Sequence, residues 1–331
     1  MEHHPSERLS ETFPAAPPST EPLEAEEPAA VSSESPTTAS AGGNREGWWA
    51  AGMALLYLLF YQGTLHIPSE HIGVIWTTTL LALLILLLFT VRVARALRSP
   101  QSLAINLILS ALLFLPLALT RPLLILFPGW HGWHYVIPAV FKYTFAVSQI
   151  GLHSLLLVWF ASSLGVLVSR IVREVKMLMP IALALACVDL YVVFGGGGPV
   201  KQAVTGRSHV AQAAMRSLTA KLAPPQPHAA MPMQLAVGFA DFMFIALFFA
   251  CLARFRIPAR WTFVVLFVLL AVYMVLTSYV ETLPALVPIA IVMIGMNLRR
   301  FRYSRSEAFA LLYAGIIVVA VIGGLFFLYR K

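Results

Sequence analysis

The sequence predicts an all-α protein, a polytopic transmembrane helical bundle of about nine spans. Hydrophobic residues make up 59% of the 331 residues and charged residues 11%, against roughly 25% charged in soluble domains. The mean hydropathy is +0.80. Apolar runs near the ~20 residues that a helix needs to cross a bilayer recur along the chain. Together these observations exclude a soluble globular domain and indicate an integral, multi-pass membrane protein.

Residues 1–46 differ from the rest of the chain. They are rich in Pro, Ser, Thr, Ala and Glu, and they hold nine of the fifteen acidic residues. A segment with so few large apolar residues cannot bury enough surface to offset the entropy lost on ordering. We therefore expect a disordered acidic tail over 1–46 and a transmembrane domain over 47–331.

The transmembrane domain contains nine apolar runs. They cover roughly 48–66, 71–91, 103–127, 136–168, 177–196, 233–253, 261–280, 284–298 and 308–329. The fourth run is long enough to tilt in the bilayer or to begin with an interfacial segment.

Basic residues predict the orientation of these spans. Clusters of Arg and Lys follow the second, fourth, sixth and eighth runs, at 92–98, 170–176, 254–260 and 299–305. The opposite loops at 67–70, 128–135 and 281–283 contain no Lys or Arg. Because cytoplasmic loops carry the positive excess, we expect a cytoplasmic N-terminus. The membrane would be the cell inner or plasma membrane, or the endoplasmic reticulum if the source is eukaryotic.

Asp189 and Asp241 are the only aspartates in the chain, and both lie inside apolar runs. A carboxylate at the bilayer centre costs at least ~2.5–3.5 kcal/mol on insertion scales, so such residues are rare and mark functional sites. The Trp-His-Gly-Trp-His stretch at 130–134 has the spacing of a metal site but no acidic or Cys neighbour, and it is typical of an interfacial aromatic belt. We expect neither a metal ion nor a cofactor.

The two aspartates are predicted to lie at the same depth. The interval from the basic Lys176 to Asp189 equals the interval from Asp241 to the basic Arg254, since 189 − 176 equals 254 − 241. Leu286 precedes Arg299 by the same interval, 299 − 286. At ~1.5 Å rise per residue, all three positions are about 20 Å from the basic clusters.

Leu286 belongs to Leu283-Pro284-Ala285-Leu286-Val287-Pro288, where two prolines interrupt regular helix pairing. Irregular backbone inside a membrane is tolerated where it lines protein or a water-filled cavity. Two neighbouring carboxyl groups in such a cavity cannot both ionise easily. The pair therefore shares one proton, with one acid ionised and the other protonated. An ionised acid beside a protonated acid is the state in which an aspartic protease activates water and polarises a peptide carbonyl.

Three segments of this region resemble the signatures of the presenilin and signal peptide peptidase family of intramembrane aspartyl proteases. They are Val-Asp-Leu-Tyr-Val-Val-Phe-Gly at 188–195, Gly-Phe-Ala-Asp-Phe at 238–242 and Pro-Ala-Leu at 284–286. The family has an aspartate in a Tyr-Asp context, a Gly-x-Gly-Asp motif and a Pro-Ala-Leu turn, in the same order on three spans. The resemblance covers about 177–298.

The resemblance implies a presenilin-like catalytic core in which Asp189 and Asp241 are the catalytic pair. It also implies that Gly238, Pro284, Ala285 and Leu286 shape the active site and receive the substrate. The loop at about 195–232, which contains a candidate surface helix at 207–222, would pair with an unwound substrate segment by strand addition.

The chain departs from the family pattern at Val188, where Tyr is usual, and at Ala240, which replaces the second glycine of Gly-x-Gly-Asp. We expect the Ala240 methyl group to limit how closely the fifth and sixth spans approach, because small residues set helix separation in membranes. The family has five spans before its first catalytic span and ends with the Pro-Ala-Leu span. Here there are four before it, and the run at 308–329 is additional.

The charge pattern places the Asp189 span running outward from the cytoplasm, as in signal peptide peptidase. The expected partners are therefore the lipid bilayer and transmembrane or signal-peptide substrates with a cytoplasmic N-terminus, and not nucleic acid. A different class of function stays open: a transporter or proton channel that uses the two aspartates as an ion relay. A third interpretation is structural, with the two acids joining helices through hydrogen bonds.

Overall fold

The computed structural model describes residues 37–67, 72–126, 149–194, 209–222, 236–277, 283–300 and 303–306, with single positions up to 320. The chain divides into two compact units, Met1–Thr38 and Ala39–Lys331. Nearly all described residues belong to the second unit, and the description below concerns that unit.

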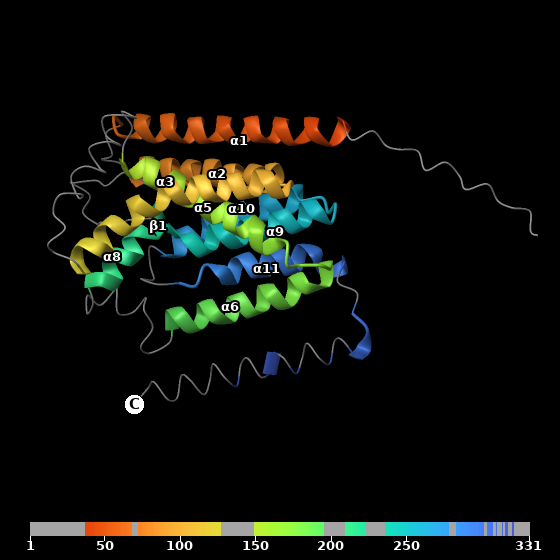
Figure 1. Cartoon of the computed structure of the whole chain (residues 1–331). Helices are drawn as coiled ribbons and strands as arrows, with labels where there is room; N and C mark the ends of the chain where they lie inside the picture. The colour runs from red at the N-terminus through yellow and green to blue at the C-terminus, as the bar shows by residue number, and fades with distance from the viewer. Residues whose placement is uncertain are drawn as a thin grey trace, which may run out of the picture. The chain divides into compact units, whose positions relative to one another are not determined.

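The described chain is predominantly helical (Figure 1). The α-helices are α1 (Thr37–Thr64), α2 (Ile72–Ala96), α3 (Pro100–Leu126), α5 (Gln149–Ser169), α6 (Leu178–Phe194), α8 (His209–Ser217), α9 (Phe239–Arg254), α10 (Arg260–Thr277) and α11 (Leu286–Asn297). Two short 3-10 helices, η1 (Val175–Met177) and η2 (Leu298–Arg300), precede α6 and follow α11. Strands β1 (Thr219–Lys221) and β2 (Ala236–Gly238) form a small antiparallel sheet.

Five of the described helical segments are long and apolar enough to cross a membrane: Gly73–Ala96, Pro100–Leu119, Ile150–Ser169, Val175–Val193 and Arg260–Thr277. The predicted helical class is thus confirmed, and five candidate spans lie among the described residues, so the predicted total of about nine stays a prediction. The run at 308–329 and the first part of the fourth run lie largely outside the described residues. Helix α1 begins at Thr37, so it takes in residues 37–46 of the predicted tail.

Helices α9 and α11 are shorter than the runs that contain them, with 16 and 12 residues. The apolar runs begin near residues 233 and 284, but α9 begins at Phe239 and α11 at Leu286. Strand β2 precedes α9, and the Pro-Ala turn precedes α11. Hydropathy counts these approach segments as span because their residues are apolar, although their backbones are not helical.

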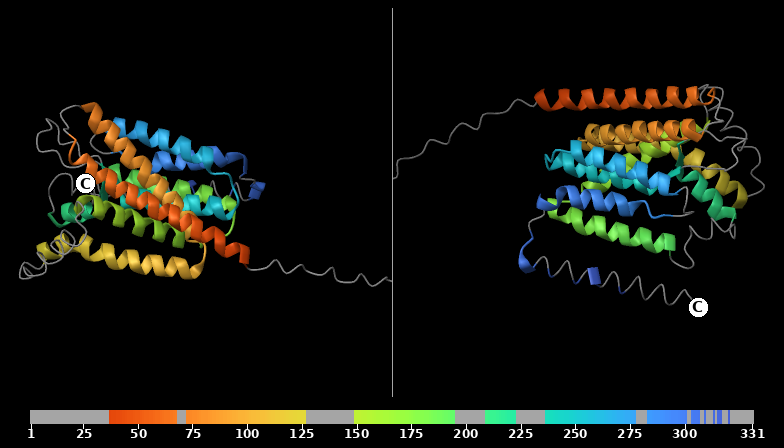
Figure 2. Two further views of the ribbon diagram at one scale, coloured as in Figure 1. Left: turned by 90° about the horizontal axis from the view of Figure 1, so that it is seen from above. Right: turned by 180° about the vertical axis from the view of Figure 1, so that it is seen from behind.

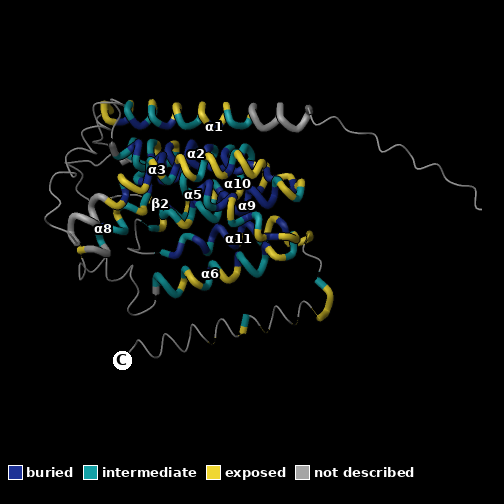
Figure 3. Tube along the Cα trace, in the orientation of Figure 1, coloured by how far each residue is buried: buried dark blue, intermediate teal, exposed yellow. Residues whose placement is uncertain are grey.

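Helix α9 lies at the centre of the packing and is buried along most of its length (Figure 3). It packs chiefly against α5 and α2. The helices approach closely at Gly165 of α5, where an added Cβ would lie 2.1 Å from the carbonyl oxygen of Met243. Since Met243 follows Asp241 by two residues, the contact at Gly165 fixes the part of α9 that carries the second aspartate.

Helix α11 lies between α6 and α9, as Figure 1 and the right panel of Figure 2 show. It packs most extensively against α6 and α10 and makes a smaller contact with α9. Helix α6 contributes few buried side chains and has exposed residues along its length (Figure 3). The first aspartate is therefore positioned by α11 rather than by direct packing of α6 on α9.

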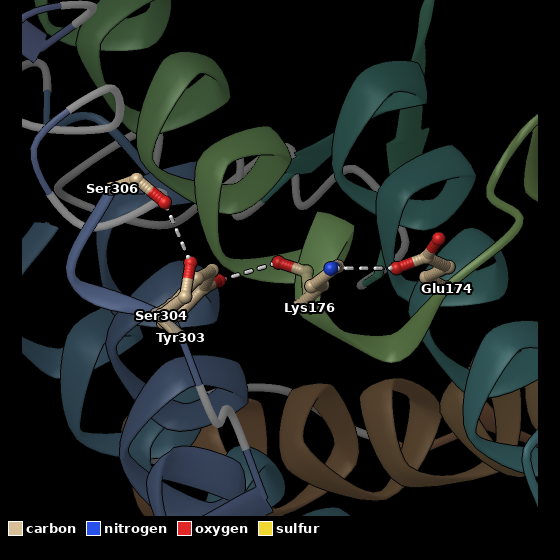
Figure 4. Close-up of polar contacts among 5 residues, drawn as sticks. All are labelled: Glu174, Lys176, Tyr303, Ser304 and Ser306. Atoms are coloured by element: carbon tan, nitrogen blue, oxygen red, sulfur yellow. Dashed lines mark hydrogen bonds and ion pairs between the residues drawn. The ribbon is translucent and has the colours of Figure 1, made fainter. Parts of the chain in front are cut away.

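The basic loops meet at one end of the bundle. The guanidinium of Arg170 donates to the carbonyl oxygen of Arg98 at 3.2 Å, and that of Arg254 donates to the carbonyl oxygen of Val172 at 3.1 Å. The hydroxyl of Tyr303 donates to the carbonyl oxygen of Lys176 (Figure 4). These bonds join the segments that follow α2, α5 and α11 to each other or to the end of α9. The connections between the helices are therefore held together at this end of the bundle, which we call the base.

Helix α9 ends at this base in a Schellman motif. Ile257 N–H donates to Leu252 O at 2.8 Å, and Arg256 N–H donates to Ala253 O at 3.3 Å. Arg256 adopts a φ of 54°, the left-handed conformation that this motif requires after the helix. The tight turn reverses the chain directly into α10, which begins at Arg260.

At the other end, β1 is anchored to the helices. Its Lys221 N–H donates to Oγ of Ser154 on α5 at 3.0 Å, and the hydroxyls of Ser154 and Tyr57 lie 3.3 and 3.4 Å from the Lys221 carbonyl oxygen. The predicted surface helix at 207–222 is α8, which stops at Ser217, and β1 occupies the rest of that range. This anchored strand holds β2 beside the start of α9.

Candidate active site

Asp189 on α6 contacts the Pro-Ala-Leu turn directly. The backbone N–H of Leu286 donates to Asp189 Oδ2 at 2.8 Å, across 97 residues of sequence. Leu286 is the first residue of α11, and its side chain is buried. The bond places the carboxylate at the N-terminus of α11, where the unpaired N–H groups and the helix dipole favour negative charge.

The two prolines explain why the Leu286 N–H is free to bind a carboxylate. Pro288 has no N–H, and its ring excludes a helical carbonyl at Pro284, four residues earlier. The helix therefore cannot extend backward by another turn, and Ala285 becomes its N-cap residue. Because alanine has no side-chain acceptor for the first N–H groups, Asp189 supplies one from another helix.

Asp241 is the third residue of α9, and its carboxylate folds back onto the residue that precedes the helix. The N–H of Gly238 donates to Asp241 Oδ2 at 3.0 Å. Gly238 is the N-cap residue, with extended backbone at φ −71° and ψ 155°. A Cβ at position 238 would lie 3.2 Å from Asp241 Oδ2, so glycine eases the close approach of this carboxylate and is not needed for an unusual φ.

Both acids thus accept a backbone N–H at the first turn of a helix, Asp241 from its own helix and Asp189 from α11. The two partly buried carboxylates are close enough to interact electrostatically. In each, Oδ2 is the bonded oxygen, and within the described part of the chain no donor is assigned to either Oδ1. One oxygen of each acid is therefore fixed, and the other is available to a proton, a water molecule or a substrate.

This arrangement suits general acid–base chemistry. Backbone N–H donors hold the two neighbouring carboxyl groups in place. Unlike Arg or Lys partners, these neutral donors do not neutralise the charge of the acids. An ionised member of such a pair takes a proton, and a protonated member donates one. Among the described residues, no cluster of three His, Cys, Asp or Glu side chains could hold a metal ion.

The structure brings Leu286, with Pro284 and Ala285 directly before it, to Asp189, and Gly238 to Asp241, while their part in an active site stays a prediction. The expectation for Ala240 is wrong, because its side chain is exposed and the α6 and α9 helices are separated by α11. Val188 is also 53% exposed, so its side chain points away from the carboxylate-bearing face of α6. The stretch at 130–134 lies outside the described residues.

Strand β2 runs directly into this site. Its residues pair with β1 in the register Thr219–Gly238, Ala220–Val237 and Lys221–Ala236. Phe239 N–H donates to Leu218 O at 2.9 Å, and backbone groups along an antiparallel strand alternate in direction, so the N–H and C=O groups of Gly238 point away from β1. The backbone groups of Ala236, two residues earlier, point the same way. The outer edge of β2, which faces away from β1, therefore leads to Asp241.

Tyr273 on α10 is a further residue of the site that sequence reasoning missed. Both Asp189 and Asp241 act electrostatically on its phenol group. The hydroxyl is buried and has no hydrogen-bond partner among the described residues. The signal was present in the sequence, because the interval from Arg260 to Tyr273 is the same as the interval that placed the two aspartates and Leu286.

Comparison of the chain with protein-family models, with curated proteins and with solved structures found no match of any kind.

Proposed function

We propose that this chain is an intramembrane aspartic endopeptidase that hydrolyses peptide bonds within transmembrane helices or signal peptides. The observation that carries the proposal is the bond from Leu286 N–H to Asp189, which joins the Pro-Ala-Leu turn to one acid while the other acid stands beside it. The ordered resemblance of 188–195, 238–242 and 284–286 to the presenilin and signal peptide peptidase signatures supports the same function.

The reaction uses the two free carboxyl oxygens. The ionised acid takes a proton from water while the water oxygen forms a bond to the peptide carbonyl carbon, and the protonated acid gives its proton to the carbonyl oxygen. In the second step the C–N bond breaks, its electron pair stays on nitrogen, and an acid protonates that nitrogen. One hydroxyl of the intermediate returns its proton to the dyad. The sum is one peptide bond and one water converted to a carboxylic acid and an amine.

A substrate helix must first unwind, because a regular helix keeps its carbonyl groups in its own hydrogen bonds. At the outer edge of β2, the backbone groups of Ala236 and the carbonyl group of Gly238 can pair with an extended segment just before α9, while the Gly238 N–H donates to Asp241. Strand addition there would run the substrate past Asp241 and satisfy its exposed backbone. Gly, Ser or Pro near the middle of the substrate helix would speed cleavage by weakening that helix.

The membrane arrangement that belongs to this proposal has about nine spans, a cytoplasmic N-terminus and a presenilin-like core. The short helices α9 and α11 would complete their crossings through their irregular approach segments, which line the hydrated site. The basic loops joined at one end of the bundle would then face the cytoplasm.

The test reconstitutes the purified protein in lipid vesicles with a single-span peptide that carries Gly and Ser at mid-span. Mass spectrometry should find two products whose masses sum to that of the substrate plus one water. Vesicles with the Asp189→Asn/Asp241→Asn double variant serve as the control, and an internal pH dye records proton flux. An intact peptide together with dyad-dependent proton flux would establish the transporter instead.

A further inference from the structure

Tyr273 occupies a defined position on α10. It follows Leu266 by seven residues and Leu270 by three, so it shares a helix face with these two buried leucines. At ~1.5 Å rise per residue, its interval from Arg260 places it about 20 Å from the basic end, at the depth of the acids. The helices α6, α9, α10 and α11 therefore each place one polar group at the same distance from the basic end of the bundle. These groups are two carboxyl groups, the Tyr273 hydroxyl and the Leu286 N–H.

The hydroxyl of Tyr273 is unusual among the buried hydroxyls of the described residues. Four of these have no partner: Tyr61, Ser162, Ser163 and Tyr273. The two serines lie within α5, where rotation brings a serine hydroxyl to the carbonyl one turn earlier. Tyr61 lies beside Tyr57, with ring centroids 5.9 Å apart. Tyr273 is the member of this group on which both aspartates act.

An unsatisfied buried donor destabilises a folded protein by roughly 1–3 kcal/mol, so a partner is expected in at least one functional state. A tyrosine hydroxyl is a neutral donor near pH 7, because the phenol ordinarily ionises near pH 10. The Tyr273 hydroxyl can therefore donate to an acceptor that the substrate supplies. Peptide hydrolysis brings one, the carbonyl oxygen of the scissile bond, whose negative charge grows as the water oxygen adds.

We propose that Tyr273 is a third catalytic residue, whose hydroxyl donates a hydrogen bond to the scissile carbonyl oxygen as that carbon becomes tetrahedral. This inference rests on the proposed protease function. The protonated acid and the tyrosine approach the oxygen from different helices, and both interactions strengthen as charge develops. A buried donor that has no other partner to give up needs little reorganisation during the reaction, which is the property of an effective oxyanion site.

The substitution Tyr273→Phe removes the donor and keeps the ring. Tyr61→Phe is the matched control, since it deletes another buried, unpartnered hydroxyl far from the acids in sequence. We expect Tyr273→Phe to lower kcat by about 100-fold, the usual effect of losing one oxyanion donor. KM should stay within about twofold, because the interaction forms in the transition state. Tyr61→Phe should keep wild-type kinetics, and neither variant should melt below the wild-type protein, because each loses a buried hydroxyl without a partner.

A pair of inhibitors separates catalysis from positioning. A peptide isostere that carries a tetrahedral hydroxyl in place of the scissile carbonyl mimics the intermediate, and its deoxy counterpart does not. Tyr273→Phe should weaken the hydroxyl isostere by at least about tenfold and leave the deoxy isostere unchanged. An unchanged kcat, or equal weakening of both isosteres, would overturn the assignment. Absence of cleavage by the wild-type protein would instead overturn the proposed function.

Discussion

The backbone N–H of Leu286 lies 2.8 Å from Asp189 Oδ2 and donates to it, which joins the first turn of α11 to the middle of α6. Direct packing between α6 and α9 is slight, so this bond and the α11 helix determine where one acid stands relative to the other. A hydrogen bond to a charged group contributes roughly 1.5–3 kcal/mol. The geometry of the acid pair therefore depends on a turn that is distant from both acids in sequence.

The first prediction concerns Pro288, which stops α11 from extending backward. Pro288→Ala lets the helix grow by a turn, so that the Leu286 N–H can bond to the carbonyl four residues earlier instead of Asp189. We expect peptidase activity to fall by about tenfold, given the strength of a charge-assisted bond, without loss of Tm. Pro180→Ala is the control, because Pro180 is likewise the third residue of its helix, α6, but has no carboxylate partner at that turn. Equal activity in both variants would show that the Leu286 contact is dispensable.

Gly238 gives a second prediction, because its missing side chain leaves room for the Asp241 carboxylate. In Gly238→Ala the new Cβ would lie 3.2 Å from Oδ2, and the carboxylate must shift by a few tenths of an ångström. Since misplacement of a catalytic group by ~1 Å costs up to about 100-fold in rate, we expect a loss of roughly tenfold in kcat. Gly295→Ala adds a methyl group to open space on α11 and should keep full activity. Wild-type kcat in the position 238 variant would mean that Asp241 tolerates displacement.

A third prediction concerns stability rather than chemistry. Gly165→Ala would place a Cβ 2.1 Å from the Met243 carbonyl oxygen, a distance that forces α5 and α9 apart. Overpacking of this kind costs typically ~1–3 kcal/mol and more where backbone is the obstacle. The variant should show a lower Tm in detergent than wild type and reduced activity even at low temperature. Gly52→Ala on α1 meets no atom within 4 Å and should melt like the wild-type protein. A wild-type Tm for the Gly165 variant would argue against this packing of α5 on α9.

The sequence predicted the helical class and the contact between Asp189 and the Pro-Ala-Leu turn, but not where the helices around them begin. Counting residues from the basic clusters placed Asp189, Asp241 and Leu286 at one depth, because rise per residue along a helix is constant. Hydropathy did not reveal where α9 and α11 begin, since the strand at 236–238 and the turn at 283–285 are as apolar as the helices. Both acids bind at helix N-termini, whose positions depend on where α9 and α11 begin. The hydrogen bonds from the N–H groups at these N-termini were therefore not predicted.

The directions of individual side chains were also not predictable from the sequence. Ala240 adjoins Asp241 in the chain, yet consecutive helical residues point about 100° apart, and its methyl group is exposed. Tyr273 lies on a different helix, α10, yet its phenol group interacts electrostatically with Asp241. No local motif marks Tyr273, and the only signal in the sequence is its interval from Arg260, so its place near the acids became clear when the helices were placed.

The fourth prediction is the polarity of the substrate. If the basic loops face the cytoplasm, α6 runs outward and α9 returns, and a chiral active site accepts a substrate strand in one direction only. Two reporter peptides with the same core sequence and opposite insertion in vesicles test this prediction. The reporter whose N-terminus lies on the side of the basic loops should be cleaved faster. Preference for the other reporter would contradict the assigned orientation and leave the chemistry of the site unaffected.

The central claim is that Asp189 and Asp241 act as one acid pair, and single substitution of each tests it most directly. Asparagine keeps a side-chain oxygen for the Leu286 or Gly238 N–H, so both variants should insert and melt as the wild-type protein does. The cleavage rate of a single-span peptide in vesicles should fall by roughly 10³-fold or more in Asp189→Asn and equally in Asp241→Asn, because neither acid works without the other. More than about a tenth of the wild-type rate in either folded variant would contradict the paired mechanism.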